Sequence, residues 1–159
     1  MLTTAPSVPI VVPPCGRRTY ATHPSPLGNL LLVAEGGILI ALALEEEQWA
    51  RPIDPMWKHD PESLAVPRHE LDEYFAGARR TFSIPVAPSG TRFQLEVWAA
   101  LTGIAYGTTA TYGSIASAVG RPAAARAIGG ANHVNPVPII VPCHRVMGAD
   151  GSLTGYGGG

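Results

Sequence analysis

Residues 111–131, which read TYGSIASAVGRPAAARAIGGA, decide the fold of the C-terminal half. Thr111 is a residue type that caps helices, and apolar residues then recur at helical spacing up to Gly120, which is typical of a helix end. Pro122 predicts the start of a second, alanine-rich helix that runs through about Ala131. Two short helices joined by a Gly-Arg-Pro turn predict a helix-turn-helix.

A domain boundary is predicted just upstream of this motif. The composition of Ala87-Pro88-Ser89-Gly90 is typical of a linker, and Thr91 to Gln94 then fits a capping box for a further helix. The charge changes at the same place: residues 1–89 carry 7 basic and 10 acidic side chains, whereas residues 90–159 carry 4 and 2. We therefore expect domains over residues 15–89 and 90–159, preceded by a flexible tail over residues 1–14.

The N-terminal half is predicted to be a small antiparallel sheet with a helix. Apolar runs over residues 29–34 and 38–44 flank Gly36-Gly37, a hairpin signal, and a helix is expected from Pro67 to Gly77. The fold class is therefore α+β, with two small domains. Two further expectations are a strand over residues 81–86 and a solvated helix face that carries the acids Glu70, Asp72 and Glu73.

Composition excludes several classes of protein. The chain has 159 residues, of which 46% are hydrophobic, so it can form a packed core, and no apolar run approaches the ~18 residues that a membrane span needs. The N-terminus has no basic region of a secretory signal. The two cysteines, Cys15 and Cys143, favour reduced thiols in a cytoplasmic protein with no membrane contact. No complete zinc ligand set is visible around Cys15, so no metal is expected.

The segment Pro142-Cys143-His144-Arg145 carries the candidate chemistry. A cysteine beside histidine and arginine lies in positive potential, which would lower the pKa of its thiol and populate the nucleophilic thiolate. A Cys-His pair alone is more often part of core packing. Here a short proline-bounded run, residues 137–141, precedes the cysteine, and a glycine-rich loop able to line a pocket follows it.

Four linked motifs give this pattern a family resemblance. They are Pro-Cys-His-Arg-Val at 142–146, Tyr-Gly-x-Ile-Ala at 112–116, Ala-Ala-Arg-Ala-x-Gly at 124–129 and Gly-Tyr-Gly-Gly-Gly at 155–159. Residues 91–159 thereby resemble the O6-alkylguanine-DNA alkyltransferases, and residues 17–89 match more loosely at 25–28 and 74–77. The resemblance implies a ribonuclease-H-like N-terminal domain and a C-terminal, winged-helix-like DNA-binding domain that carries the active-site cysteine.

The resemblance also implies a reaction. An O6-alkylguanine is flipped out of duplex DNA, and its alkyl group is transferred irreversibly to Cys143, so each molecule acts once. This chemistry requires no metal or organic cofactor. The implied partner is double-stranded DNA that contains O6-alkylguanine, with O4-alkylthymine as a further candidate substrate, and the protein is expected to be a monomer.

The matching positions receive roles from the family. His144 would deprotonate Cys143 through a water, Tyr112 would crowd the 3′ phosphate and donate to the guanine ring, and Asn135 would brace the turn before the active-site segment. Arg126 would fill the gap left by the flipped base, on a helix whose small residues allow close approach to the minor groove. The remaining implied DNA contacts are Ala125, Ala127 and Gly129, and the implied pocket walls are Val146, Tyr156, Gly157 and Gly158.

One part of the family pattern has no counterpart here. No residue matches the family's last helix or the glutamate that it directs at the catalytic histidine. A truncated chain, another partner for His144 and reduced activity all remain open. Two other functions also remain open: a non-catalytic lesion-binding protein that recruits another repair pathway, and an unrelated thiol hydrolase, for which Arg126 would have no purpose.

Overall fold

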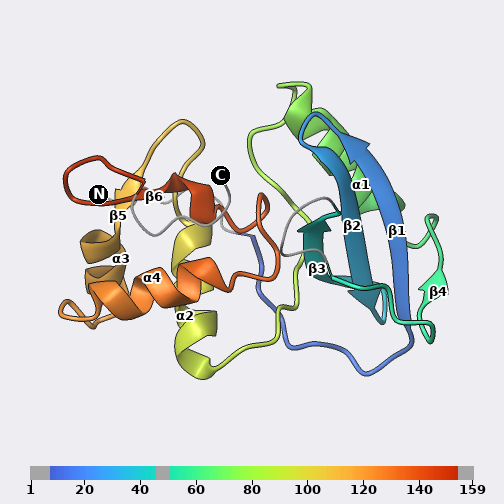
Figure 1. Ribbon diagram of the computed structural model, residues 1–159, viewed down its shortest axis with the longest axis horizontal. Helices are drawn as coiled ribbons and strands as arrows, with labels where there is room; N and C mark the ends of the chain where they lie inside the picture. Colours follow the sequence, from blue (N-terminus) through green and yellow to red (C-terminus); the bar gives the residue numbers. More distant parts are fainter. Residues whose placement is uncertain (1–7, 46–50, 154–159) are drawn as a thin grey trace. The chain divides into compact units, whose positions relative to one another are not determined.

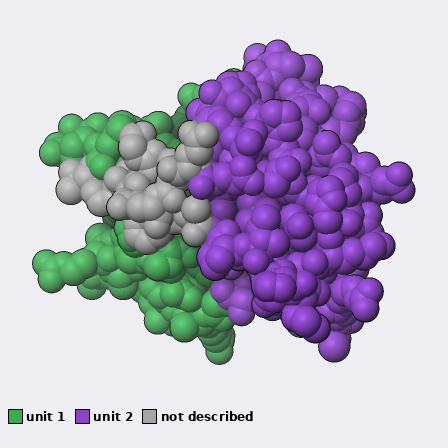
Figure 2. Space-filling model, turned by 45° about the vertical axis from the view of Figure 1, so that its right-hand side comes forward, with its two compact units in different colours: residues 1–8, 90–159 green, residues 9–89 purple. Residues whose placement is uncertain are grey.

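The computed structural model describes residues 8–45 and 51–153, and Figure 1 labels its helices and strands. The chain divides into two compact units, coloured separately in Figure 2. One unit comprises residues 9–89, and the other comprises residues 1–8 together with residues 90–159. Each unit is described by itself below.

A four-stranded sheet of order β3-β2-β1-β4 forms the centre of the unit of residues 9–89. Strand β1 (Arg18–Ser25) pairs antiparallel with β2 (Gly28–Glu35), and β2 pairs antiparallel with β3 (Ile38–Leu44). The short β4 (Lys58–His59) lies parallel to β1. Gly36 and Gly37 both have positive φ, 56° and 82°, which is the backbone of a tight hairpin turn and confirms the turn predicted there.

The middle of β2 is buried on both faces, because residues 30–34 are all at most 2% exposed. Helix α1 (Ala65–Phe75) packs against β1 (Figure 1). Its Leu71 is fully buried. The helix begins two residues earlier than predicted, so Pro67 lies in its first turn, where the missing N–H costs no helical hydrogen bond.

The prediction of a solvated acidic face on α1 is wrong for Glu70, whereas Asp72 is exposed as predicted. Glu70 is 2% exposed and accepts hydrogen bonds from the backbone N–H of Ser83, at 2.9 Å, and from the Ser83 hydroxyl. Asp72 accepts from Nε2 of the buried His23 at 2.7 Å. The buried face of α1 therefore includes the carboxylate of Glu70. Hydrogen bonds from Ser83, which is distant in the sequence, compensate this carboxylate for its loss of contact with water.

The contacts of Val86 correct two predictions, the flexible tail over residues 1–14 and the strand over residues 81–86. Its N–H donates to Pro9 and its carbonyl accepts from Val11, both at 2.9 Å, so residues 9–11 are paired and do not belong to a tail. Residues 81–86, predicted as a strand, contribute only isolated bridges at Val86, to Ile10 and to Leu39.

The C-terminal unit is built around three helices and a two-stranded sheet. Its elements are α2 (Arg92–Thr102), β5 (Ala110–Thr111), α3 (Tyr112–Ala118), α4 (Ala125–His133), the 3₁₀ turn η1 (Cys143–Arg145) and β6 (Val146–Met147). The predicted capping box at Thr91 is confirmed, and Thr111 caps α3 reciprocally with Ser114. Trp98 of α2 is buried and donates its Nε1–H to the Ala131 carbonyl at 2.9 Å, which ties α2 to α4.

Helices α3 and α4 confirm the predicted helix pair, with Gly120 at φ 72° between them. Helix α4 begins at Ala125, three residues after Pro122, because the Ala124 N–H closes a turn onto the Arg121 carbonyl at 2.9 Å. It extends to His133, slightly beyond the predicted end.

Candidate active site

The segment before Cys143 is folded back by two successive turns. Ile139 has φ 73°, a left-handed backbone that is rare for a β-branched residue, and the Val141 N–H donates to the Val137 carbonyl at 3.0 Å. Pro142 has φ −82° and ψ 65°, an inverse γ-turn in which the Cys143 N–H donates to the Val141 carbonyl at 2.8 Å. Cys143 therefore stands at the start of η1 in a backbone with little freedom.

Asn135 joins both ends of this segment. Its Nδ2–H donates to the Val141 carbonyl at 2.9 Å, and its Oδ1 accepts from the Val137 N–H at 3.0 Å. One side chain thus satisfies backbone groups on both sides of the left-handed Ile139. This geometry suits the bracing role expected for Asn135.

Cys143 is 6% exposed, and burial raises the pKa of its thiol above the ordinary value of 9.0. Hydrogen bonding from the Asn135 side chain and from the backbone N–H groups of Cys143 and His144 opposes that rise in pKa only in part. The prediction of a lowered thiol pKa is therefore wrong, because desolvation by burial outweighs the hydrogen bonds that lower the pKa. The Arg145 guanidinium donates to the Ile104 carbonyl at 2.7 Å and lies 5.6 Å from the centre of the Tyr106 ring.

His144 is half-buried, and its pKa lies below the ordinary 6.5, first because of burial and then because of the Arg145 charge. A lowered pKa keeps the imidazole neutral at pH 7. A neutral imidazole can accept a proton, and a thiol of raised pKa still carries one, which are the starting protonation states that general-base catalysis by His144 requires.

Tyr112 is the first residue of α3, and its ring lies against α4. A Cβ on Gly129 would lie 3.8 Å from its Cε1 atom. Burial first, and then the negative charge of an ionised Cys143, raise the pKa of Tyr112, and a hydrogen bond from the Asn132 side chain opposes this rise. Tyr112, Asn132 and Cys143 are therefore neighbours, although they are distant in sequence.

Sequence reasoning missed Asn132, which is 3% exposed on α4. Its Nδ2–H donates to the Cys143 carbonyl at 3.3 Å. A signal was present, because Asn132 follows the fully buried Ile128 by four residues and so stands where the helical repeat calls for an apolar side chain.

The residues expected to contact DNA lie on the first half of α4. Arg126 and Ala127 are exposed, Ala125 and Gly129 are half-buried, and no described residue pairs with the Arg126 guanidinium. Of the expected pocket walls, Val146 is fully buried in β6, where it pairs with Ala110. Tyr156, Gly157 and Gly158 lie outside the described residues.

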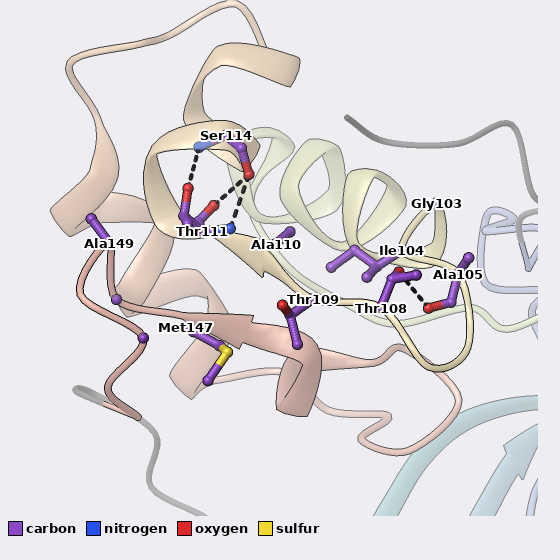
Figure 3. A pocket seen from close by; sticks show the side chains of 12 residues that line it. Gly103, Ile104, Ala105, Thr108, Thr109, Ala110, Thr111, Ser114, Met147 and Ala149 are labelled. Atoms are coloured by element: carbon purple, nitrogen blue, oxygen red, sulfur yellow. Dashed lines mark hydrogen bonds between the residues drawn. The ribbon is translucent and has the colours of Figure 1, made fainter.

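A cavity of about 300 Å³ opens beside β5 and β6, lined by Ile104, Thr108, Thr109, Ser114, Met147 and others (Figure 3). None of the site residues named above lines it. Within residues 8–45 and 51–153, no three His, Cys, Asp or Glu side chains gather closely enough to hold a metal ion. In the same ranges, no helix has the length and apolar character needed to cross a membrane.

Comparison with known proteins matches both halves of the chain. The profile described as "6-O-methylguanine DNA methyltransferase, ribonuclease-like domain" matches residues 19–88, and the corresponding "DNA binding domain" profile matches residues 92–159. The constitutive methylated-DNA–protein-cysteine methyltransferase of Bacillus subtilis is 44% identical over 142 residues, which cover 87% of this chain and 86% of the relative. The Mycobacterium tuberculosis methylated-DNA–protein-cysteine methyltransferase is 47% identical over 140 residues, covering 88% and 84%.

Solved structures agree with these matches. The crystal structure of Mycobacterium tuberculosis O6-methylguanine methyltransferase superposes with a TM-score of 0.82 and 47% identity, covering 89% of this chain and 86% of that one. Mycobacterium tuberculosis OGT in complex with DNA gives a TM-score of 0.81 and 46% identity, covering 89% and 85%. With the two profiles and these relatives covering most of its length, the chain belongs to the 6-O-methylguanine-DNA methyltransferase family.

Proposed function

We propose that the protein repairs DNA by moving the alkyl group of an O6-alkylguanine onto the Cys143 sulfur, once per molecule. The observation that carries this proposal is the position of a buried cysteine beside a histidine of lowered pKa, in the segment that follows a helix-turn-helix. The names of the relatives, methylated-DNA–protein-cysteine methyltransferases, describe the same chemistry.

The step is a displacement at the alkyl carbon. His144 takes the thiol proton, directly or through a water, and the sulfur forms a bond to carbon as the carbon–oxygen bond breaks. The electron pair stays on the guanine, and the Tyr112 hydroxyl supplies a proton to its ring. The proton held by His144 restores the tyrosine, so the net change is replacement of the thiol hydrogen by the alkyl group. The resulting thioether does not revert, which limits each molecule to one turnover.

DNA binding is assigned to the exposed first turns of α4. Arg126 is exposed and pairs with no described residue, so its guanidinium can enter a base stack, and the small Ala125 and Ala127 let the helix approach closely. Tyr112, Cys143 and α4 belong to one unit of the chain.

The test mixes the protein with a duplex that contains one O6-methylguanine and measures the intact mass of the protein. One methyl group on the wild type and none on Cys143→Ser is the expected result. Tight binding of the lesion without an adduct would favour a lesion-binding protein instead, and no binding at all would reject both functions.

Arg126→Ala tests base flipping. This variant should react far more slowly with the duplex than the wild type does, and nearly as fast with the free alkylguanine base, because a free base needs no extrusion. An equal loss on both substrates would remove Arg126 from that role.

We also propose a cytoplasmic location. Cys143 must remain a free thiol to act, and a reducing compartment preserves thiols. Separating cells into fractions and detecting the native protein in each fraction would test this location.

A further inference from the structure

The Asn132 carboxamide occupies an unusual position on α4. It is nearly fully buried, and among the described residues its Oδ1 has no hydrogen-bond partner. A buried acceptor without a partner lowers stability, and an apolar side chain of similar size would avoid that cost. Stability alone therefore does not explain an asparagine at this position.

The orientation of this amide follows from the Cys143 carbonyl. Nδ2 lies 3.3 Å from that oxygen and donates to it. Exchanging Nδ2 and Oδ1 would bring two acceptors together, which is unfavourable. The Nδ2 group, with its two hydrogens, therefore faces the active-site turn.

The Asn132 side chain also hydrogen-bonds Tyr112 and lowers the pKa of that phenol, as a bond donated to the phenol oxygen does. Because Oδ1 has no partner among the described residues, the donor is Nδ2. Since the phenol oxygen is the acceptor in this contact, the phenolic proton must point away from Asn132. A single amide thus holds the backbone of the alkyl acceptor and sets the direction in which the phenol can donate.

We propose that Asn132 is a positioning residue for the transfer step. Its amide joins the Cys143 backbone to the Tyr112 hydroxyl and so directs the phenolic proton towards the departing guanine. The inference rests on the proposed function, and it assigns Asn132 no contact with the alkyl carbon. Its effect on the rate should therefore pass through Tyr112.

A double-mutant cycle on the full chain tests this coupling. Asn132→Leu, Tyr112→Phe and the double variant are mixed with saturating O6-methylguanine duplex, and single-turnover transfer to Cys143 is followed by intact mass. We expect Asn132→Leu to lower the maximal rate at least about tenfold, since misplacing a reacting group by an ångström is that costly, with unchanged affinity for the duplex. In the Tyr112→Phe background the same change should cost less than about twofold, because coupled groups are non-additive.

Trp98→Phe is the matched control, because it removes a buried hydrogen bond to the neighbouring residue of α4, Ala131. It should leave the maximal rate within about twofold of the wild type and combine additively with Tyr112→Phe. If Asn132→Leu does not fold, as judged by circular dichroism, Asn132→Asp enters the same cycle. The carboxylate keeps the shape, but it cannot donate and would draw the phenolic proton towards itself.

The inference is overturned if the fold-losses in rate of the two single variants multiply in the double variant. It is also overturned if the Asn132 variant transfers at the wild-type rate. Such outcomes leave the proposed function intact, because wild-type transfer is measured in the same experiment. Failure of the wild type itself to acquire a methyl group would instead refute the function.

Discussion

Replacing His144 by alanine should change how alkyl transfer depends on pH. Burial places the pKa of the Cys143 thiol above 9.0, and burial together with Arg145 places the pKa of His144 below 6.5. Between those limits the site holds a protonated thiol and a neutral imidazole. When the imidazole takes the proton during attack, the reactive protonation state stays constant across this interval. The wild-type rate should therefore be flat from about pH 6.5 to 9.0 and should fall in more acidic solution as His144 becomes protonated.

The His144→Ala variant has no such base, so only a Cys143 thiol that has already lost its proton to solvent can attack the alkyl carbon. The raised pKa of the thiol leaves Cys143 mostly protonated at pH 7, and the variant lacks a positioned general base, so it should be slower than the wild type by about 100-fold or more. Its rate should then rise about tenfold per pH unit up to pH 9, as the thiolate population does. The gap between the two proteins should consequently narrow with rising pH.

The assay measures single-turnover rates with saturating O6-methylguanine duplex from pH 5.5 to 9.5. Circular dichroism at each pH verifies that both proteins remain folded. A variant with a flat profile, or with the same loss at every pH, would refute a proton-accepting role for His144. A wild-type rate that already rises tenfold per unit above pH 7 would show that transfer relies on thiolate formed beforehand.

Substitutions at three further sites, one of them with a control, test the geometry. Thr91→Ala removes the capping box that Thr91 forms with Gln94 and should lower the free energy of unfolding by about 1 kcal/mol, measured by urea denaturation. Arg79→Met removes the guanidinium that lies 3.6 Å from the buried Glu70 carboxylate, and it should lower the midpoint temperature of thermal unfolding. Arg92→Met removes an exposed ion pair and should change that temperature little. Asn135→Ala breaks two hydrogen bonds of the active-site turn and should cost about 2 kcal/mol of unfolding free energy while also slowing transfer, and a change in neither quantity would contradict the bracing role.

Local patterns in the sequence predicted the elements that depend on neighbouring residues. The caps at Thr91 and Thr111 and the Gly36-Gly37 turn were visible because each involves side chains or backbone angles within four residues. The start of α4 was misplaced by three residues, because proline permits a helix start without requiring one, and here Arg121 and Ala124 form a separate turn first.

Features that depend on distant residues could not be predicted in this way. The buried Glu70 has its partner Ser83 thirteen positions away, and the amide of Asn132 meets Cys143 eleven positions away. The thiol pKa was predicted in the wrong direction because sequence shows the charges beside Cys143 but not its burial, which has the larger effect. Only packing of the whole unit decides how much water reaches the sulfur.

The left-handed Ile139 has a consequence for the motions of the active-site turn. A β-branched residue in that backbone region stores roughly 1–3 kcal/mol, which the surrounding hydrogen bonds must hold in place. Once one of the hydrogen bonds of the Val137, Val141 and Cys143 N–H groups opens, the stored energy favours opening of the other two. The segment should therefore open in a two-state manner. In deuterated water the amide protons of Val137, Val141 and Cys143 should then exchange at a common rate.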